Sequence, residues 1–180
     1  MASTYLTRTT GTPTLGTKCT VSVWVKICEV PGGSGTDRWL FGEYGNGSNH
    51  SYLYLRNSSE IGWYEADGSG TVASIITNRL CRDLNGWYHF MIVYDTTLST
   101  QADRFKMYIN GERQTSFSTN NQPSQGQGLR WNEATSTSGP SIGRTGTWDA
   151  RYFEGCMSHI HLIDGTQYAA SDFGSTDSTT

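Results

Sequence analysis

Apolar and polar residues alternate along short stretches of this chain, and clusters of Gly, Asn, Asp and Ser separate the stretches. In the segment 19–28 every second residue is aliphatic, at Val21, Val23, Val25 and Ile27. Because successive side chains of a β-strand point to opposite faces, these four share one face and the residues between them share the other. The segment therefore predicts a strand with one face against a core.

Similar patterns along the rest of the chain predict an all-β, antiparallel sandwich or barrel with minimal helix. The segment GWYHFMIVYD is apolar on both faces, which predicts a central strand covered on both sides. Helix is expected only as short turns in TLSTQADRF and YAASDFG. The strands are expected near residues 3–9, 19–28, 38–44, 51–57, 60–66, 70–77, 86–95, 103–110, 112–118, 140–144 and 151–163.

Turn-forming residues indicate how neighbouring strands pair. Asn110-Gly111 lies between two of the expected strands and is a strong signal for a two-residue hairpin. The interval 115–139 is the longest polar stretch of the chain, and we interpret it as a loop. Loops of this length are often functional, so we expect binding residues in it.

Composition narrows the class of protein. At 180 residues the chain has the length of one domain, so we expect a single domain over 1–180, with 171–180 as a polar tail or a connection to a missing region. Only 16% of the residues are charged and the net charge is -3, which argues against nucleic-acid binding. No apolar run reaches the ~20 residues that span a bilayer, and the first residues lack the apolar core of a signal peptide. No membrane insertion is expected.

The cysteines, at positions 19, 28, 81 and 156, are too sparse for a disulfide scaffold. Cys19 and Cys28 lie at opposite ends of one predicted strand, much farther apart than the ~7 Å between Cα atoms that a disulfide allows. A bond between Cys81 and Cys156 stays open, although we favour free thiols. The chain has no Cys-x-x-Cys pair, which argues against a zinc ribbon.

A series of six segments covers most of the chain: TVSVWVKI (20–27), WLFGEY (39–44), LNGWYHFMIVYDTT (84–97), FKMYINGE (105–112), PSIGR (140–144) and YFEGCMSHIHLIDG (152–165). In this order and spacing they resemble the laminin-G-like, concanavalin-A-like jelly-roll family. The resemblance implies a two-layered β-sandwich without a universal cofactor. Members of the family commonly bind glycans or protein surfaces through loops at one rim, some of them with calcium.

The terminal segments YLTRT and HLIDGTQYAASDFG resemble a narrower subgroup, found in virion proteins of marine bacteriophages. This resemblance implies a non-catalytic recognition module of a tail fibre or head decoration, binding a glycan or a cell-surface receptor. It implies location in the virion after synthesis in the host cytoplasm without a signal peptide. It also implies other virion proteins as partners and a symmetric homo-oligomer when mounted. A purely structural decoration or adaptor protein is the alternative, and a glycan hydrolase a more distant one.

Residues with catalytic potential are few. Some glucanases with this sandwich place carboxylates at alternate positions of one strand, but here Glu65-Ala66-Asp67 lacks the third carboxylate and Asp67 precedes a glycine turn. We interpret the pair as a solvated strand end and turn, and we expect no enzyme. His89 lies within an apolar strand and is interpreted as a core histidine bonded to a backbone carbonyl.

Metal ligation is considered at two places. His159 and His161 are two residues apart on a predicted strand and share a face, a spacing that can support a metal, but we interpret them as an exposed polar face. Asn132, Glu133 and Asp149 are calcium candidates by loop position only, because no calcium-loop motif accompanies them. No cofactor is expected.

Two loop tryptophans provide the binding-site prediction. Trp131 and Trp148 lie in polar, Gly-flanked surroundings, and sugar rings stack on indoles while amides, carboxylates and guanidinium groups bind the hydroxyls. The competing interpretation is that both indoles fold inward and anchor their loops. Trp63 and Tyr64 are less informative, because the segment IGWYEA alternates as a strand and can place Trp63 in the core. We expect the ligand-binding residues to be Trp131, Asn132, Trp148, Asp149 and Arg151, which would share one rim.

Overall fold

The alternating segment near the N-terminus forms strand β2 (Lys18–Ile27), and its four alternating aliphatic side chains are fully buried, as the pattern predicts. It pairs antiparallel on both sides, with β12 (Gly155–Asp164) and with β7 (Tyr88–Asp95). β7 is the segment that is apolar on both faces, and all its residues are buried. Its expected central position is confirmed.

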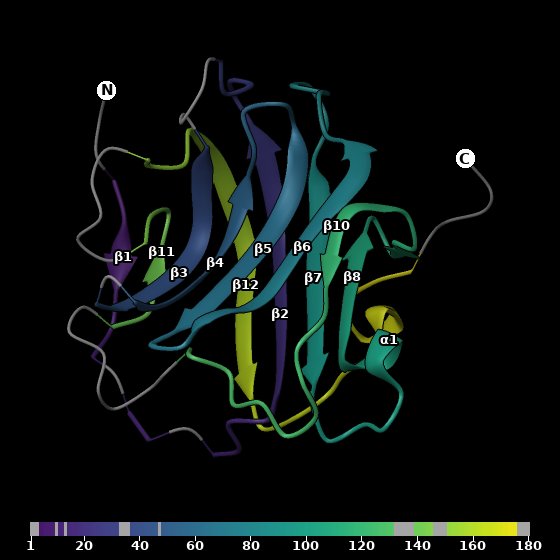
Figure 1. Cartoon of the computed structure of the whole chain (residues 1–180). Coiled ribbons are helices and arrows are strands. Elements are labelled where there is room, and N and C mark those ends of the chain that lie inside the picture. Colours follow the sequence, from purple (N-terminus) through teal and green to yellow (C-terminus); the bar gives the residue numbers. More distant parts are fainter. Residues whose placement is uncertain are drawn as a thin grey trace.

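Two antiparallel sheets stack face to face in a computed structural model that describes residues 4–9, 11–12, 14–32, 37–46, 48–131, 139–145 and 151–175 (Figure 1). Within these residues one sheet has seven strands in the order β1-β11-β3-β4-β5-β6-β10, and the other has five in the order β12-β2-β7-β8-β9. This confirms the predicted all-β sandwich. The further strands are β1 (Leu6–Thr7), β3 (Arg38–Asn46), β4 (Asn49–Leu55), β5 (Glu60–Asp67), β6 (Gly70–Leu80), β8 (Phe105–Ile109), β9 (Glu112–Arg113), β10 (Phe117–Asn121) and β11 (Ser141–Ile142).

The core lies between the two sheets. The aliphatic residues of β2 and β7 meet Leu53, Ile61 and Ile75 from the seven-stranded sheet. Trp63 of β5 is fully buried, and its ring lies 5.5 Å from that of Phe105 on β8, so it joins the two layers. A buried large apolar side chain contributes roughly 1.5–3 kcal/mol relative to an exposed one.

Strand β10 lies within the interval 115–139, for which the polar sequence predicts a loop. It pairs antiparallel with β6 at the edge of the seven-stranded sheet. Its sequence, FSTNN, has little apolar content, because an edge strand is held by backbone hydrogen bonds and exposes most of its side chains. The loop interpretation is therefore wrong for these residues.

The predicted Asn110-Gly111 hairpin joins β8 and β9. Asn110 and Gly111 have φ of 52° and 79°, the left-handed values that a two-residue turn of this type requires. The two helical candidates form one short turn each, α1 (Gln101–Arg104) and η1 (Ala170–Asp172). In the described part of the chain, neither is long and apolar enough to cross a membrane.

The C-terminal residues 166–175 fold back over the outer face of the five-stranded sheet. The Thr20 hydroxyl donates to the carbonyl oxygen of Thr166 (2.9 Å) and accepts from the N–H of Tyr168 (3.1 Å). The ring of Phe173 lies 6.3 Å from that of His89. Part of the expected polar tail is thus packed against the sheet, whereas 176–180 lie outside the described residues.

All four cysteines are free thiols, as favoured from the sequence. Cys19 and Cys81 are buried, whereas Cys28 and Cys156 are exposed. Burial raises the pKa of the Cys81 thiol to about 12 and also raises that of Cys19, so both stay protonated at neutral pH. The buried thiols act as small apolar side chains.

Candidate functional site

The outer face of the seven-stranded sheet holds a cluster of aromatic rings, here called the aromatic face. Strand β4 directs Leu53 and Leu55 into the core, so the alternate residues of the strand point away from it. Strands β3 and β5, on either side, add rings to the same face. The rings of the aromatic face are those of Trp39, Tyr44, His50, Tyr52, Tyr54 and Tyr64.

Four of these rings form a stacked platform with His50 at its centre. The imidazole centroid lies 5.7 Å from Tyr52, 5.5 Å from Tyr64 and 6.0 Å from Tyr44, with interplanar angles of 8°, 19° and 23°. Tyr52 and Tyr64 are themselves 5.4 Å apart and nearly parallel. Offset stacks at about 4.5–7 Å are favourable, so the four rings hold one another in place.

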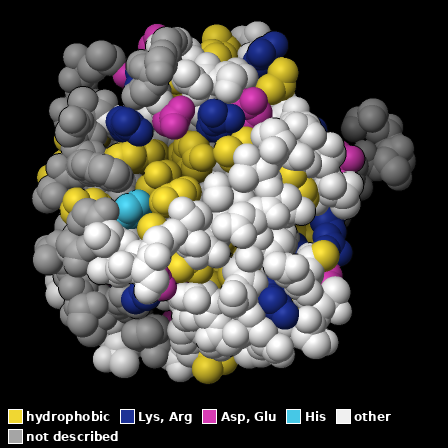
Figure 2. Space-filling model, in the orientation of Figure 1, with side chains coloured by type: hydrophobic (Ala, Val, Ile, Leu, Met, Phe, Trp, Pro, Cys, Tyr) yellow, Lys and Arg dark blue, Asp and Glu magenta, His cyan; other side chains and the backbone are white. Residues whose placement is uncertain are grey.

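The platform is open to solvent at its tyrosines. Tyr44, Tyr52 and Tyr64 are partly exposed, whereas His50 is only 6% exposed beneath them. Figure 2, which views the outer side of the seven-stranded sheet, shows apolar side chains gathered in its upper centre, with basic and acidic side chains along the border. A flat aromatic surface bordered by charged groups is suited to a ligand with both apolar faces and polar edges.

Two glycines let this face pack closely. A Cβ atom at Gly62 would lie 2.4 Å from the Tyr54 ring, so only glycine allows that ring to lie flat on β5. Gly42 is covered in the same way by Thr145, whose hydroxyl would be 1.8 Å from an added Cβ. Tyr54 is consequently buried, and burial raises its pKa to about 12.

A shallow hollow of about 370 Å³ continues the platform toward the turn between β5 and β6. Its volume falls within the range of about 300–1,000 Å³ that is usual for ligand pockets. The Tyr64 hydroxyl lies 3.0 Å from the Thr71 hydroxyl, which fixes the ring at the border of the hollow. The lining residues are Ser48, His50, Tyr64, Ala66, Asp67, Gly68, Ser69, Gly70 and Thr71.

The carboxylates of Glu65 and Asp67 are both held by Arg130. The backbone N–H of Arg130 donates to Glu65 (3.3 Å), and its guanidinium lies 3.5 Å from the Asp67 carboxylate. Glu65 is 0% exposed and faces the core, where burial and this carboxylate raise the pKa of Tyr94. The interpretation of Glu65 as a solvated strand end is therefore wrong, and both acids anchor the loop that precedes Trp131.

Arg151 lies at the border of the aromatic face. Its carbonyl oxygen accepts a hydrogen bond from the N–H of Trp39 (3.1 Å), and its guanidinium carbon lies 5.2 Å from the Trp39 ring centroid. The guanidinium also acts on Tyr52, whose pKa is raised mainly by burial and is lowered in part by this positive charge. Arg151 thus supplies the aromatic face with a hydrogen-bond donor.

Trp131 is packed inside the sandwich. Its indole is 5% exposed, lies 4.9 Å from Trp63 and 5.7 Å from Phe41, and donates its N–H to the carbonyl oxygen of Ser51 (3.3 Å). This is the inward-folded arrangement, the competing interpretation of the two loop tryptophans. Trp131 therefore offers no exposed stacking surface.

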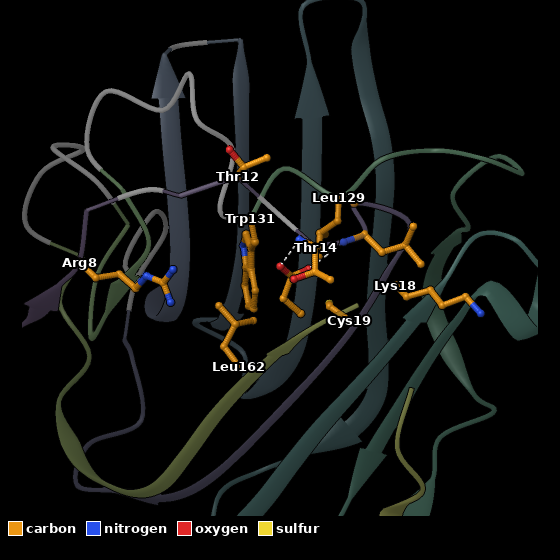
Figure 3. A pocket seen from close by; sticks show the side chains of 11 residues that line it. Arg8, Thr12, Thr14, Lys18, Cys19, Leu129, Trp131 and Leu162 are labelled. Atoms are coloured by element: carbon orange, nitrogen blue, oxygen red, sulfur yellow. Dashed lines mark hydrogen bonds between the residues drawn. The ribbon is translucent and has the colours of Figure 1, made fainter. Parts of the chain in front are cut away.

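One edge of Trp131 borders a cavity of about 290 Å³ between the N-terminal segment and the end of β12 (Figure 3). Figure 3 shows the indole standing between Thr12 and Leu162, while Lys18 points away, toward the carboxylate of Asp95 at 3.2 Å. The one acid among the described lining residues, Asp164, accepts the backbone N–H of Thr14. Two of the charged groups that line the cavity, Lys18 and Asp164, are thus engaged in contacts within the chain.

The predicted binding residues are not brought together as far as the structure describes them. Trp131 faces the core, whereas Arg151 lies beside Trp39 on the outer face of the seven-stranded sheet. Asn132, Trp148 and Asp149, together with the calcium candidate Glu133, lie outside the described residues. Their roles stay predictions.

The three histidines of the five-stranded sheet each contact a hydroxyl group or an aromatic ring. His89 lies on the outer face beneath Phe173, where its Nε2 is 2.8 Å from the Ser22 hydroxyl and burial lowers its pKa. Its partner is a side-chain hydroxyl, not the backbone carbonyl that we expected. Among the described residues, no group of three or more His, Cys, Asp or Glu side chains is placed to hold a metal ion.

The tyrosines and His50 of the aromatic face were not proposed from the sequence. The sequence did contain a pattern that could have predicted them. In HSYLYL every second residue carries a ring, and on a strand these rings lie on the face opposite to that of Ser51, Leu53 and Leu55. Three aromatic residues on one face of a strand, with aliphatic residues on the other, indicate a second, outward-facing cluster.

Comparisons with known proteins give the same architecture. Residues 2–170 match the profile of the concanavalin A-like lectin/glucanases superfamily. The fold resembles domain 4 of an extracellular arabinanase from Geobacillus stearothermophilus, solved with arabinotriose (TM-score 0.61, 14% identity, 89% of this chain and 68% of that chain). It also resembles the CBM40 module of the Ruminococcus gnavus IT-sialidase (TM-score 0.57, 13% identity, 95% and 97%).

A third similar structure is a Bacteroides ovatus protein for which carbohydrate binding has been inferred (TM-score 0.56, 17% identity, 90% of this chain). The chain spans only 42% of the length of that protein. At these identities the similarity shows the fold alone. The curated proteins contain no significant match to this sequence.

Proposed function

The chain belongs to the concanavalin A-like lectin/glucanases superfamily, and on this premise we propose that it is a non-catalytic module that binds a glycan on the aromatic face. The observation that supports this most directly is the stack of His50 with Tyr44, Tyr52 and Tyr64 on an open sheet surface. Rings held in this way present a rigid platform that loses little conformational entropy when a ligand binds.

The chemistry of the platform matches a sugar. The C–H face of a pyranose or furanose ring packs on the half-exposed Tyr52 and Tyr64, while hydroxyl groups reach the polar border. That border contains the Tyr64 and Thr71 hydroxyls, the Asp67 carboxylate and the Arg151 guanidinium. The superfamily and the three similar structures, which include modules named for carbohydrate binding, support the same class of ligand.

A binding role is favoured over hydrolysis by the state of the candidate acids. Glycoside hydrolysis requires two carboxylates on either side of the scissile bond, about 5–9.5 Å apart and in contact with substrate. Here Glu65 points into the core and Asp67 is paired with Arg130, so the two do not face a common ligand space.

Binding on the aromatic face is tested with Tyr64→Ala. Tyr108→Ala is the matched control, since Tyr108 is also half-exposed but lies on β8 of the other sheet. The wild-type chain is first screened on a glycan array that includes arabinan and sialylated oligosaccharides, and the strongest ligand is then titrated calorimetrically. Losing one aromatic contact should weaken binding by about two- to tenfold.

Tyr108→Ala should bind as the wild type does, and both variants should keep their melting temperatures within a few degrees. An array without any bound glycan, or equal affinities of Tyr64→Ala and wild type, would refute the proposal for this face. Release of reducing sugar from the bound glycan would instead favour the hydrolase alternative.

As its setting we propose a phage virion, in a tail fibre or head decoration, with other virion proteins as partners and a symmetric homo-oligomer when mounted. The support is the resemblance of YLTRT and HLIDGTQYAASDFG to marine bacteriophage proteins. Mass spectrometry of purified particles, together with a reconstruction of the position that the chain occupies, tests this. A mounted chain that binds no sugar would favour the structural adaptor alternative, and a mounted copy without symmetry mates would contradict the oligomer.

A further inference from the structure

We infer a second carbohydrate site, for neutral sugars, on the outer face of the five-stranded sheet. It is centred on Trp24 of β2 and lies on the opposite side of the sandwich from the aromatic face. The inference stands on this surface alone and holds whether or not the aromatic face binds a glycan.

The site begins as a row of residues across three neighbouring strands and the turn that follows β8. Ser158 of β12 pairs with Trp24, and Trp24 pairs with His89 of β7. The backbone N–H of His89 donates to the side-chain oxygen of Asn110 (2.8 Å), the residue that follows β8. A hydroxyl, an indole, an imidazole and an amide therefore follow one another across the sheet, so that polar groups flank an aromatic ring on both sides.

The central indole is fixed in orientation and partly exposed. Trp24 stacks on His89 with centroids 5.0 Å apart and an interplanar angle of 25°, and His89 is in turn bonded to Ser22. Trp87, just before β7, is 43% exposed, the highest exposure of any tryptophan in the described residues. Trp24 and Trp87 line the same hollow and form one apolar patch, and such patches often mark binding sites.

Two hollows flank Trp24. One, of about 300 Å³, is lined by Trp24, Trp87, Ser158 and His159. The other, of about 260 Å³, lies between Trp24, His89 and Asn110 on one side and the C-terminal segment, including Phe173, on the other. The two hollows share the Trp24 indole and together accommodate consecutive residues of a short oligosaccharide.

The lining of these hollows distinguishes the ligand. Among the described residues that line them, none is Asp, Glu, Lys or Arg. Lys26 is on the same face two residues along β2, but it lines neither hollow. A neutral ligand with apolar C–H faces and many hydroxyls fits this combination of indoles, amide, hydroxyl and imidazole, whereas the described lining gives a charged glycan no Lys or Arg side chain to pair with.

His159 provides an independent indication that this surface is specialised. It has φ of 48°, a left-handed conformation that is costly for a residue other than glycine, and it sits at the bulge between Ser158 and His161. Bulges of this kind redirect a side chain. The Ser158 hydroxyl lies 2.7 Å from Nδ1 of the His159 ring and fixes the ring beside the first hollow.

The test uses the full chain labelled with ¹⁵N, because the indole N–H groups of Trp24 and Trp87 report directly on this surface. Their resonances are assigned with Trp24→Phe and Trp87→Phe. Arabinotriose and cellotriose are the neutral probes, and sialyllactose is the charged comparison, each at millimolar concentration. The neutral trisaccharides should shift both indole signals, in wild type and in Tyr64→Ala alike.

Trp87→Ala should weaken this binding roughly tenfold, whereas Tyr108→Ala should leave it unchanged. Trp87 is half-exposed, so its removal should not unfold the chain even if that of Trp24 does. The inference is overturned if neither neutral trisaccharide shifts either signal, or if the shifts vanish in Tyr64→Ala. It is also overturned if the signals move with protein concentration in the absence of sugar, which would make this face a contact between copies.

Discussion

Removing the indole of Trp131 should destabilise the protein strongly and leave glycan binding intact. The ring packs against Trp63 and Phe41, at centroid distances of 4.9 and 5.7 Å, and its N–H is bonded to Ser51. Truncation of a buried tryptophan to alanine costs about 3–5 kcal/mol. At about 2–4 °C per kcal/mol for a chain of this size, Trp131→Ala should melt about 6–20 °C below the parent.

The loss should lie near the lower end of this range if the existing cavity beside the ring lets solvent enter the new space, and near the upper end if the space stays empty. Urea denaturation followed by circular dichroism gives the free energy of unfolding for each variant. Trp131→Phe keeps an aromatic ring but loses the N–H that donates to Ser51. Its loss of stability should exceed that due to the smaller ring by about 1 kcal/mol, the contribution of the hydrogen bond.

Trp87→Ala serves as the comparison, because its 43% exposure predicts a much smaller change in stability. If Trp131→Ala loses less than about 1 kcal/mol and binds glycan more weakly, the ring contacts ligand and the anchoring role is refuted. If stability falls and the affinity of the refolded variant is unchanged, Trp131 belongs to the core and not to the recognition surface.

Three further outcomes are expected. Stability should fall as the pH drops below about 6.5, because burial lowers the pKa of His89 only in the folded state and the unfolded chain takes up the proton first. Denaturation at several pH values should show that the stability of His89→Gln depends less on pH, and equal pH dependence in variant and wild type would contradict this role of His89. Gly62→Ala should displace the Tyr54 ring and weaken glycan binding, which titration measures, and unchanged affinity would show that the ring's position does not matter. Gly111→Ala should cost about 1 kcal/mol because its φ is 79°, whereas Gly128→Ala, with open space around it, should not; equal melting temperatures would exclude strain at the hairpin.

The strands that bury one face were predictable because the alternation of apolar and polar residues indicates which face of the strand meets the core. The valines of β2 and the apolar β7 show this, and the Asn110-Gly111 turn fixed a pairing from two residues. β10 was not predictable in this way, since FSTNN gains its place from hydrogen bonds to β6. An edge strand that is held mainly by backbone hydrogen bonds needs no alternation of apolar and polar residues, so the hydrophobic pattern does not reveal it.

The candidate site was harder to foresee for a different reason. Trp131 has polar and glycine neighbours, which suggested exposure, but the direction of a loop side chain depends on the tertiary contacts that hold the loop, here Arg130 with Glu65 and Asp67. The aromatic face, by contrast, is encoded in the local alternation of β4. Its rings come from three strands, however, and that they stack around His50 follows only from the strand order β3-β4-β5.

The bulge at His159 also affects how neighbouring molecules meet. Open sheet edges invite strands of other molecules to add to them, the first step of aggregation. Of the four edge strands in the described sheets only β12 is long, and its pairing with β2 is interrupted by a bulge between Ser158 and His161. The edge strands β1 and β9 have two residues each. The fourth, β10, is polar and pairs with a shifted register. The described sheets therefore leave no long, straight edge for another chain to extend, which favours copies that pack closely without joining their sheets.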